Sequence, residues 1–143
     1  MRPKFEIVDA PQEADRQVII DGLIAYNNSK APPTSWGPFA IRLLSDTGVS
    51  IGGLWGRFAY QWLFVELLFV PEQLRGQGIG RSIMQAAEEV AIKRACIGIW
   101  LDTFEFQARP FYEKLGYSVF GKIEDYPPGS RRYFLQKRLR NAA

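Results

Sequence analysis

Histidine is absent from this 143-residue chain, and cysteine occurs once, at Cys96. Without histidine the chain has no Ser-His-Asp or Cys-His nucleophile and no histidine general base. A zinc hydrolase site of the usual kind is also excluded. A single cysteine rules out an internal disulfide and a cysteine-cluster metal site, so we expect no metal. Any chemistry must therefore use carboxylates, tyrosine, backbone groups or a bound cofactor.

Long apolar runs are also lacking. The longest, residues 62–70, is interrupted by Glu66 and is far too short to span a bilayer. Residues 1–9 have no apolar stretch of the kind found in signal peptides. The net charge of +3 is mild, and the basic residues near the C-terminus fit a solvated strand better than an anion site. We therefore predict a soluble, cytoplasmic protein with no nucleic-acid or membrane partner.

The apolar content of 47% in a chain of this length predicts one folded domain over residues 1–143. Period-two and helical patterns predict a mixed α/β fold with helices on both faces of the sheet. The expected strands are residues 4–8, 39–44, 49–58, 61–70, 97–103, 117–123 and 131–136. The expected helices are residues 11–26, 80–94 and 108–115, and residues 27–37 are expected to form a loop.

The most informative segment is a strand followed by Arg75, three glycines at alternate positions (Gly76, Gly78 and Gly80) and a helix. Glycines allow close approach to a ligand, and a helix N-terminus offers unpaired N–H groups, so this segment predicts a phosphate or pyrophosphate site. A tight turn without a ligand is the alternative.

Two other phosphate-binding motifs fit this segment less well. A Walker A loop needs Lys-Ser/Thr after its last glycine, and none is present. A dinucleotide fingerprint would place glycine where Arg81 stands, although Asp102 lies where a ribose-binding acid is expected. The position of the segment in the middle of the chain also argues against a dinucleotide fold.

Residues 75–80, Arg-Gly-Gln-Gly-Ile-Gly, resemble the R/Q-x-x-G-x-G/A signature of the GNAT superfamily of N-acetyltransferases. Residues 111–117, Phe-Tyr-Glu-Lys-Leu-Gly-Tyr, are similar to the second marker of that family. The resemblance implies a mixed, mostly antiparallel sheet of about seven strands, with two central strands splayed at the cofactor site. It also implies that acetyl-CoA is the co-substrate.

The family resemblance assigns cofactor-binding roles residue by residue. The pyrophosphate would lie on the signature loop, which here comprises Arg75, Gly76, Gln77, Gly78, Ile79, Gly80 and Arg81. The pantetheine arm would pair with the end of the preceding strand, at Leu68, Phe69 and Val70. Many relatives have a cofactor-contacting asparagine where this chain has Glu105, and the nearby Gln107 is a possible substitute.

Acetyl transfer by direct attack needs a proton donor for the departing thiolate and a proton acceptor for the amine. Tyr112 matches the tyrosine that the family often places beside the coenzyme sulfur, although its position on an apolar stripe also fits simple packing. Glu66 is the candidate base, because a carboxylate in a strand that looks buried on both faces is costly without a purpose. A Glu66 paired with an arginine, or a water acting as base, is the alternative.

The acceptor is expected to be a primary amine, more often a small molecule than a protein. In the family its site would involve residues 27–37, Trp55, Trp62 and the pair Asp125 and Tyr126. Aromatic rings with an acid suit a small cationic amine, whereas core packing of the tryptophans is the simpler interpretation. A non-catalytic nucleotide- or coenzyme-binding module is the alternative function, and a homodimer is possible because many relatives dimerise.

Overall fold

The computed structural model describes residues 1–31 and 37–139. Chain contacts divide the molecule into two units, Met1–Pro33 and Thr34–Ala143, so the single domain stays a prediction. The first unit contains helix α1, Glu13–Lys30, whose start is capped by a hydrogen bond from the Gln12 N–H to Asp15 Oδ2 (2.8 Å). The predicted loop therefore begins after Lys30 rather than at Asn27, and its residues 32–36 lie outside the described residues.

The prediction of a strand at residues 4–8 is wrong. These residues join no β-ladder, and α1 is the only regular element that the structure describes in residues 1–31. A strand needs a neighbour to pair its backbone N–H and C=O groups. An alternating pattern of five residues says nothing about a pairing partner, and without one these residues form no strand.

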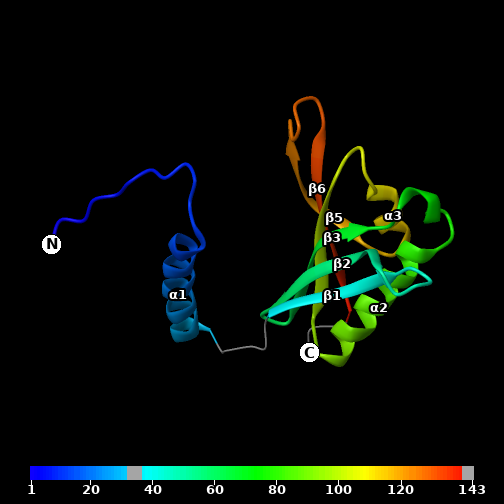
Figure 1. Ribbon diagram of the computed structural model, residues 1–143, viewed down its shortest axis with the longest axis horizontal. Helices are drawn as coiled ribbons and strands as arrows, with labels where there is room; N and C mark the ends of the chain where they lie inside the picture. The colour runs from blue at the N-terminus through cyan, green and yellow to red at the C-terminus, as the bar shows by residue number, and fades with distance from the viewer. Residues whose placement is uncertain (32–36, 140–143) are drawn as a thin grey trace. The chain divides into compact units, whose positions relative to one another are not determined.

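The second unit is built on one mixed sheet in the order β1-β2-β3-β4-β6-β5. Neighbouring strands are antiparallel except β3 and β4, which are parallel. Their course is visible in Figure 1 as the colour passes from cyan at β1 to red at β6. The sheet has six strands instead of about seven because residues 4–8 do not contribute one. The strands are β1 Gly37–Leu44, β2 Ser50–Ala59, β3 Trp62–Phe69, β4 Gly98–Phe104, β5 Ser118–Glu124 and β6 Arg131–Arg138.

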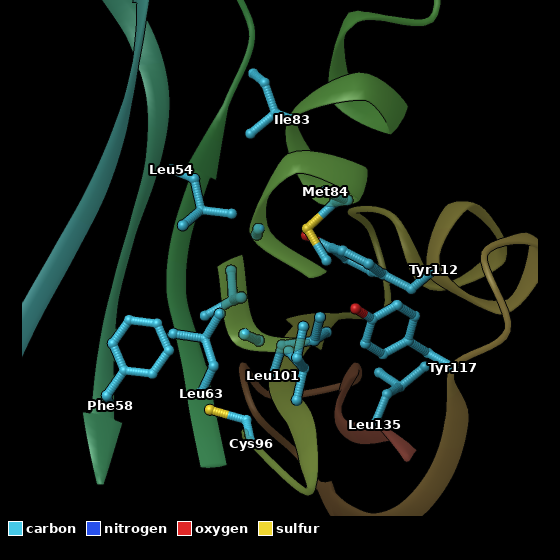
Figure 2. Packing of buried hydrophobic residues seen from close by; sticks show 14 of the residues in the cluster. Leu54, Phe58, Leu63, Ile83, Met84, Cys96, Leu101, Tyr112, Tyr117 and Leu135 are labelled. Atoms are coloured by element: carbon cyan, nitrogen blue, oxygen red, sulfur yellow. The ribbon is translucent and has the colours of Figure 1, made fainter. Parts of the chain in front are cut away.

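Two helices of this unit, α2 (Ile79–Lys93) and α3 (Arg109–Lys114), contribute to one apolar core. Alternate residues of the central strands, such as Leu63 and Leu101, form the sheet side of this core. Figure 2 shows Met84 of α2 and Tyr112 of α3 among these side chains. Both helices therefore pack on the same face of the sheet, and the expectation of helices on both faces stays a prediction. None of the described helices has the length and apolarity to cross a bilayer.

A β-bulge interrupts β3 at Glu66. In the pairing with β2, Trp55 lies opposite Leu67 but Gly56 lies opposite Val65, so Glu66 is an extra residue with no partner. The bulge reverses the inward alternation, so that residues before it face the core at odd positions and residues after it at even positions. This reversal explains why the strand looked buried on both faces in the sequence, although Glu66 itself is exposed.

The parallel strands β3 and β4 separate beyond the bulge. Their pairing ends at Val65 and Leu101, whereas β3 continues along β2 to Phe69 and β4 continues along β6 to Phe104. The predicted splaying of two central strands is therefore confirmed. Because the facing backbone edges of the two strands are no longer paired with each other, the sheet has an opening beside Glu66.

Candidate active site

The glycine-rich segment forms a short connection from β3 to α2. A single 3₁₀ turn, η1 (Glu72–Leu74), leads to Gly76 and Gly78, both with φ of +79°. This left-handed conformation favours glycine, and a Cβ added at either position would meet no protein atom within 4 Å. Gly78 is the N-cap of α2, so the N–H groups of the first turn have no partner within the helix. The loop therefore presents backbone donors and the positive end of a helix dipole to open space.

Arg75 fastens this loop to the end of β3. Its Nε donates a hydrogen bond to the Val70 carbonyl oxygen (2.9 Å), and its guanidinium lies over the Phe69 ring at 5.9 Å. The side chain is therefore already engaged in shaping the loop. Any contribution of Arg75 to anion binding would come from its charge and its backbone.

Gly80 has a different reason to be glycine. A Cβ at this position would lie 3.3 Å from the Phe111 ring, which is tighter than ordinary packing. The third glycine of the signature thus permits α3 to lie close against the first turn of α2. This contact brings the helix that carries Tyr112 next to the glycine-rich loop.

A cleft of about 1400 Å³ occupies the opening between β3 and β4. Small-molecule sites commonly measure about 300–1,000 Å³, so this cleft has room for a large cofactor and a second substrate. It is lined by all the residues predicted from the sequence for catalysis and cofactor binding except Gln77. Those residues are Glu66, Leu68, Phe69, Val70, Arg75, Gly76, Gly78, Ile79, Gly80, Arg81, Gln107 and Tyr112.

Tyr112 is a buried residue of the core and also reaches the cleft. Desolvation by burial, with a smaller contribution from the negative charge of Asp102, raises its pKa from 10.0 to about 12. The phenol therefore stays protonated throughout the physiological range. Tyr112 packs in the core and also lines the cleft. The packing interpretation and the catalytic interpretation of this residue are therefore compatible.

The raised pKa of Tyr112 predicts that the folded protein loses stability at alkaline pH. Its pKa is near 10.0 when unfolded and about 12 when folded. The folded state therefore binds more protons between these values, and stability that is complete below pH 10 is lost as pH rises through 12. We expect a loss approaching about 1.4 kcal/mol per pH unit for this group. Burial also raises the pKa of Tyr117, which adds to the effect.

Urea unfolding at about pH 9 and about pH 11 measures this loss. The matched variant Tyr112→Phe should lose less stability between the two pH values than the parent, because one of the two titrating phenols is gone. An unchanged pH slope in Tyr112→Phe would show that Tyr112 titrates alike in both states.

Glu66 projects from the bulge into the cleft, and its position differs from the sequence expectation. It is exposed rather than buried, and it forms no ion pair within the described part of the chain. The argument that a buried carboxylate must have a function therefore does not apply to Glu66. What supports a functional role is its location, because a bulge is a common means of aiming one side chain toward a site.

Gln107 has less freedom to replace the family's asparagine than the sequence suggested. Its Oε1 accepts hydrogen bonds from the Phe104 N–H (2.8 Å) and the Thr103 hydroxyl (3.2 Å). The same hydroxyl oxygen accepts a hydrogen bond from the Ala108 N–H (3.3 Å) just before α3. Gln107 therefore helps fix the start of α3, and only its amide nitrogen is available to a ligand.

The far side of the cleft contains a charged and aromatic group centred on Arg132, which the sequence analysis did not identify. Arg132 of β6 pairs with Asp102 (Nη2 to Oδ1, 2.7 Å) and donates to the Tyr126 hydroxyl (2.8 Å). Phe104 and Phe106 stack nearby with nearly parallel rings and line the cleft. Trp55 and Trp62 are not among the described residues that line it. Asp102 and Arg132 come together only through the pairing of β4 with β6. No short-range sequence pattern predicts that pairing.

Comparison with known proteins places the chain in a family. Residues 6–117 match the model of the acetyltransferase (GNAT) family. The chain is 36% identical over 135 residues to acetyltransferase Atu2258 of Agrobacterium fabrum, covering 94% of this chain and 98% of the relative. It is 39% identical over 102 residues to blasticidin-S acetyltransferase of Streptomyces morookaense, covering 71% and 75% respectively.

A solved structure agrees with this assignment. The crystal structure of an acetyltransferase from Agrobacterium tumefaciens superposes with a TM-score of 0.90 at 35% identity, covering 95% of this chain and 99% of that chain. The chain belongs to the GNAT family and is an acyltransferase of the acetyltransferase type. Members of this family use acetyl-CoA and a second, acceptor substrate.

Proposed function

We propose that this protein transfers an acetyl group from acetyl-CoA to the primary amine of a small molecule, by direct attack and without an acetylated enzyme. The observation that carries the proposal is the cleft between the splayed strands. It joins the glycine-rich loop, the part of the β3 edge beyond its pairing with β4, a protonated tyrosine and a carboxylate with no ion pair among the described residues. A non-catalytic binding module has no need for the last two groups.

The cleft fits the parts of coenzyme A in order. The N–H groups of the first turn of α2, with the open space at Gly76 and Gly78, suit the pyrophosphate. The edge of β3 that no longer pairs with β4, at Leu68 to Val70, offers backbone groups to the amides of pantetheine. Tyr112 and Glu66 line the same cleft, and the thioester would lie beside them.

The proton balance assigns roles to the two titratable groups. The amine nitrogen attacks the thioester carbonyl carbon and the carbon–sulfur bond breaks, so one proton must leave nitrogen and one must reach sulfur. Glu66, directly or through a water, accepts the proton from nitrogen. Tyr112 donates its phenolic hydrogen toward sulfur.

The raised pKa of Tyr112 refines the role of this residue. Full transfer from a phenol of pKa about 12 to a thiolate whose reference pKa is about 8.5 is uphill by about 5 kcal/mol. Tyr112 therefore acts mainly as a hydrogen-bond donor that stabilises the departing thiolate, in the manner of an oxyanion hole. Net protonation of sulfur then draws on the proton released by the amine.

We infer that the acceptor is a small cationic amine. Glu66 is unpaired within the described residues, and the rings of Phe104 and Phe106 lie in the same cleft. A carboxylate together with aromatic faces attracts an ammonium group before it is deprotonated. The relative named for blasticidin S, at 39% identity, makes that compound the first acceptor to test.

Thiol release from acetyl-CoA tests the proposal directly. The purified protein should release coenzyme A only when an amine is added, and mass spectrometry should find an acetylated amine. Glu66→Gln should lower kcat about 10-fold or more, since general base catalysis commonly contributes about 10²–10⁴. The control Glu72→Gln removes an exposed carboxylate from η1 and should leave the rate unchanged.

The outcomes separate the possible bases. A full rate in Glu66→Gln would assign the proton transfer to water alone. Binding of acetyl-CoA without transfer to any of a broad set of amines, including blasticidin S, would favour the non-catalytic module.

A further inference from the structure

Helix α3 is too short to hold its own position. It has six residues, Arg109–Lys114, and isolated helices of that length are unstable in water. Tyr112 lies in the middle of it, so the placement of the phenol depends on what fixes the two ends of this helix. The start is held by the hydrogen bonds of Thr103 and Gln107 described above.

The end of α3 is held by a lysine from a distant strand. Lys137 of β6 donates a hydrogen bond from Nζ to the carbonyl oxygen of Leu115 (2.8 Å), which is the C-cap of α3. The same ammonium forms a hydrogen-bonded ion pair with Glu88 of α2. Three elements, α2, α3 and β6, thus meet at one nitrogen atom.

This ion pair is largely enclosed. The side chain of Glu88 is 12% exposed and that of Lys137 is 31% exposed. Glu88 also interrupts the apolar face of α2, between the buried Ala87 and Ala91. Removing one partner of such a pair leaves an uncompensated charge, whereas removing both charges is often tolerated. Packing alone therefore does not require a charged pair at this location.

The residues that follow Leu115 connect the same ammonium to Tyr112. Gly116 has φ of +96°, and a Cβ there would lie 3.4 Å from Lys137 Cε, so glycine admits the lysine side chain. Lys137 Nζ lies 5.6 Å from the centre of the Tyr117 ring. Tyr117 in turn donates its N–H to the Tyr112 carbonyl oxygen (3.1 Å), and the two rings pack edge to face at 6.1 Å. Figure 2 shows these two tyrosines side by side.

We propose that Lys137 is a positioning residue for Tyr112. Through Glu88, the Leu115 carbonyl and the Tyr117 ring, it fixes the end of α3 against α2, and so sets the phenol relative to the glycine-rich loop at the start of α2. The role rests on the proposed function of Tyr112 as donor to the departing sulfur. It predicts an effect on turnover rather than on cofactor binding, because the N–H groups of the first turn of α2 lie about two helical turns from Glu88.

The double variant Glu88→Gln with Lys137→Met removes both charges together and avoids stranding one of them. We expect kcat to fall about 10-fold, with KM for acetyl-CoA and Kd for coenzyme A within about 2-fold of the parent, since small displacements of a catalytic group are costly. Lys137→Arg keeps the charge and the donors, and should restore most of kcat. The control Glu13→Gln with Arg16→Met neutralises an exposed ion pair of α1 and should change nothing.

A second measurement does not depend on activity. In protein labelled with 3-fluorotyrosine, the ¹⁹F resonance of Tyr112 is identified by its loss in Tyr112→Phe. It should shift or broaden in the Glu88→Gln, Lys137→Met protein and return in Lys137→Arg. An unchanged Tyr112 resonance in a folded double variant, or a raised KM with kcat unaltered, would overturn the proposal. Failure of the parent to acetylate any amine would instead count against the proposed function, and the resonance would still decide the role of Lys137.

Discussion

Gly78→Glu should abolish coenzyme A binding. Gly78 is the N-cap of α2 with φ of +79° and ψ of 11°, a conformation that costs a non-glycine residue about 1–2 kcal/mol. A side chain there meets no protein atom, so it would extend into the space where the pyrophosphate is proposed to lie. The added carboxylate would also repel an anion. We expect affinity to fall by about 100-fold or more, equivalent to about 2.8 kcal/mol, in isothermal titration with acetyl-CoA.

A matched glycine elsewhere separates these effects from simple destabilisation. Gly48, in the turn between β1 and β2, has φ of +83° and also has open space around its Cβ position. Gly48→Glu therefore adds the same charge and similar backbone strain outside the described cleft, and should bind acetyl-CoA normally. Normal binding by Gly78→Glu would show that the loop is not the pyrophosphate site.

Short-range patterns in the sequence predicted the parts of the site that lie on one continuous segment. The strand, the glycine-rich turn and α2 follow one another within residues 62–93, and each is specified by local chemistry. Apolar residues form the strand, φ above zero requires glycine in the turn, and an apolar stripe directs the helix to the core. For that reason the sequence correctly placed the glycine-rich turn between a strand and a helix.

The features that were missed depend on register and on distant pairing. The bulge at Glu66 inverts which residues of β3 face the core, and the continuous apolar sequence conceals that inversion. Gly56 opposite the bulge was a usable signal, since glycine inside a strand often marks one. Glu88 in the apolar face of α2 was another signal, but its partner Lys137 lies 49 positions along the chain. Nothing in one sequence indicates which cation would meet it.

The two titratable residues of the proposed mechanism are also positioned by features that local sequence patterns do not show. Tyr112 is held in place by tertiary contacts on both sides of α3, and its raised pKa is a consequence of that burial. Glu66 is placed by a strand irregularity and remains exposed. One group is thus kept protonated by the core while the other remains accessible to an incoming amine, and the splayed strands bring both to one cleft.

Tyr112→Phe should reduce kcat about 100-fold, because a positioned proton or hydrogen-bond donor commonly contributes about 10²–10⁴. The substitution removes one oxygen atom and leaves the ring, which is 7% exposed and packs against Phe111 and Tyr117. The apolar core therefore keeps its packing, and α3 should retain its position. Isothermal titration should find an unchanged Kd for coenzyme A, and steady-state kinetics should show the loss in kcat with little change in KM for acetyl-CoA.

The second tyrosine of this cluster provides the matched comparison. Tyr117 is also buried, and burial also raises its pKa, but it is not among the described residues that line the cleft. Its hydroxyl has no hydrogen-bond partner within the described structure, so Tyr117→Phe removes no interaction that the structure shows. We expect Tyr117→Phe to keep nearly the full rate, whereas Tyr112→Phe loses it. A rate in Tyr112→Phe that equals the parent's would remove Tyr112 from the mechanism. Equal losses would indicate that the pair of phenols acts as a unit.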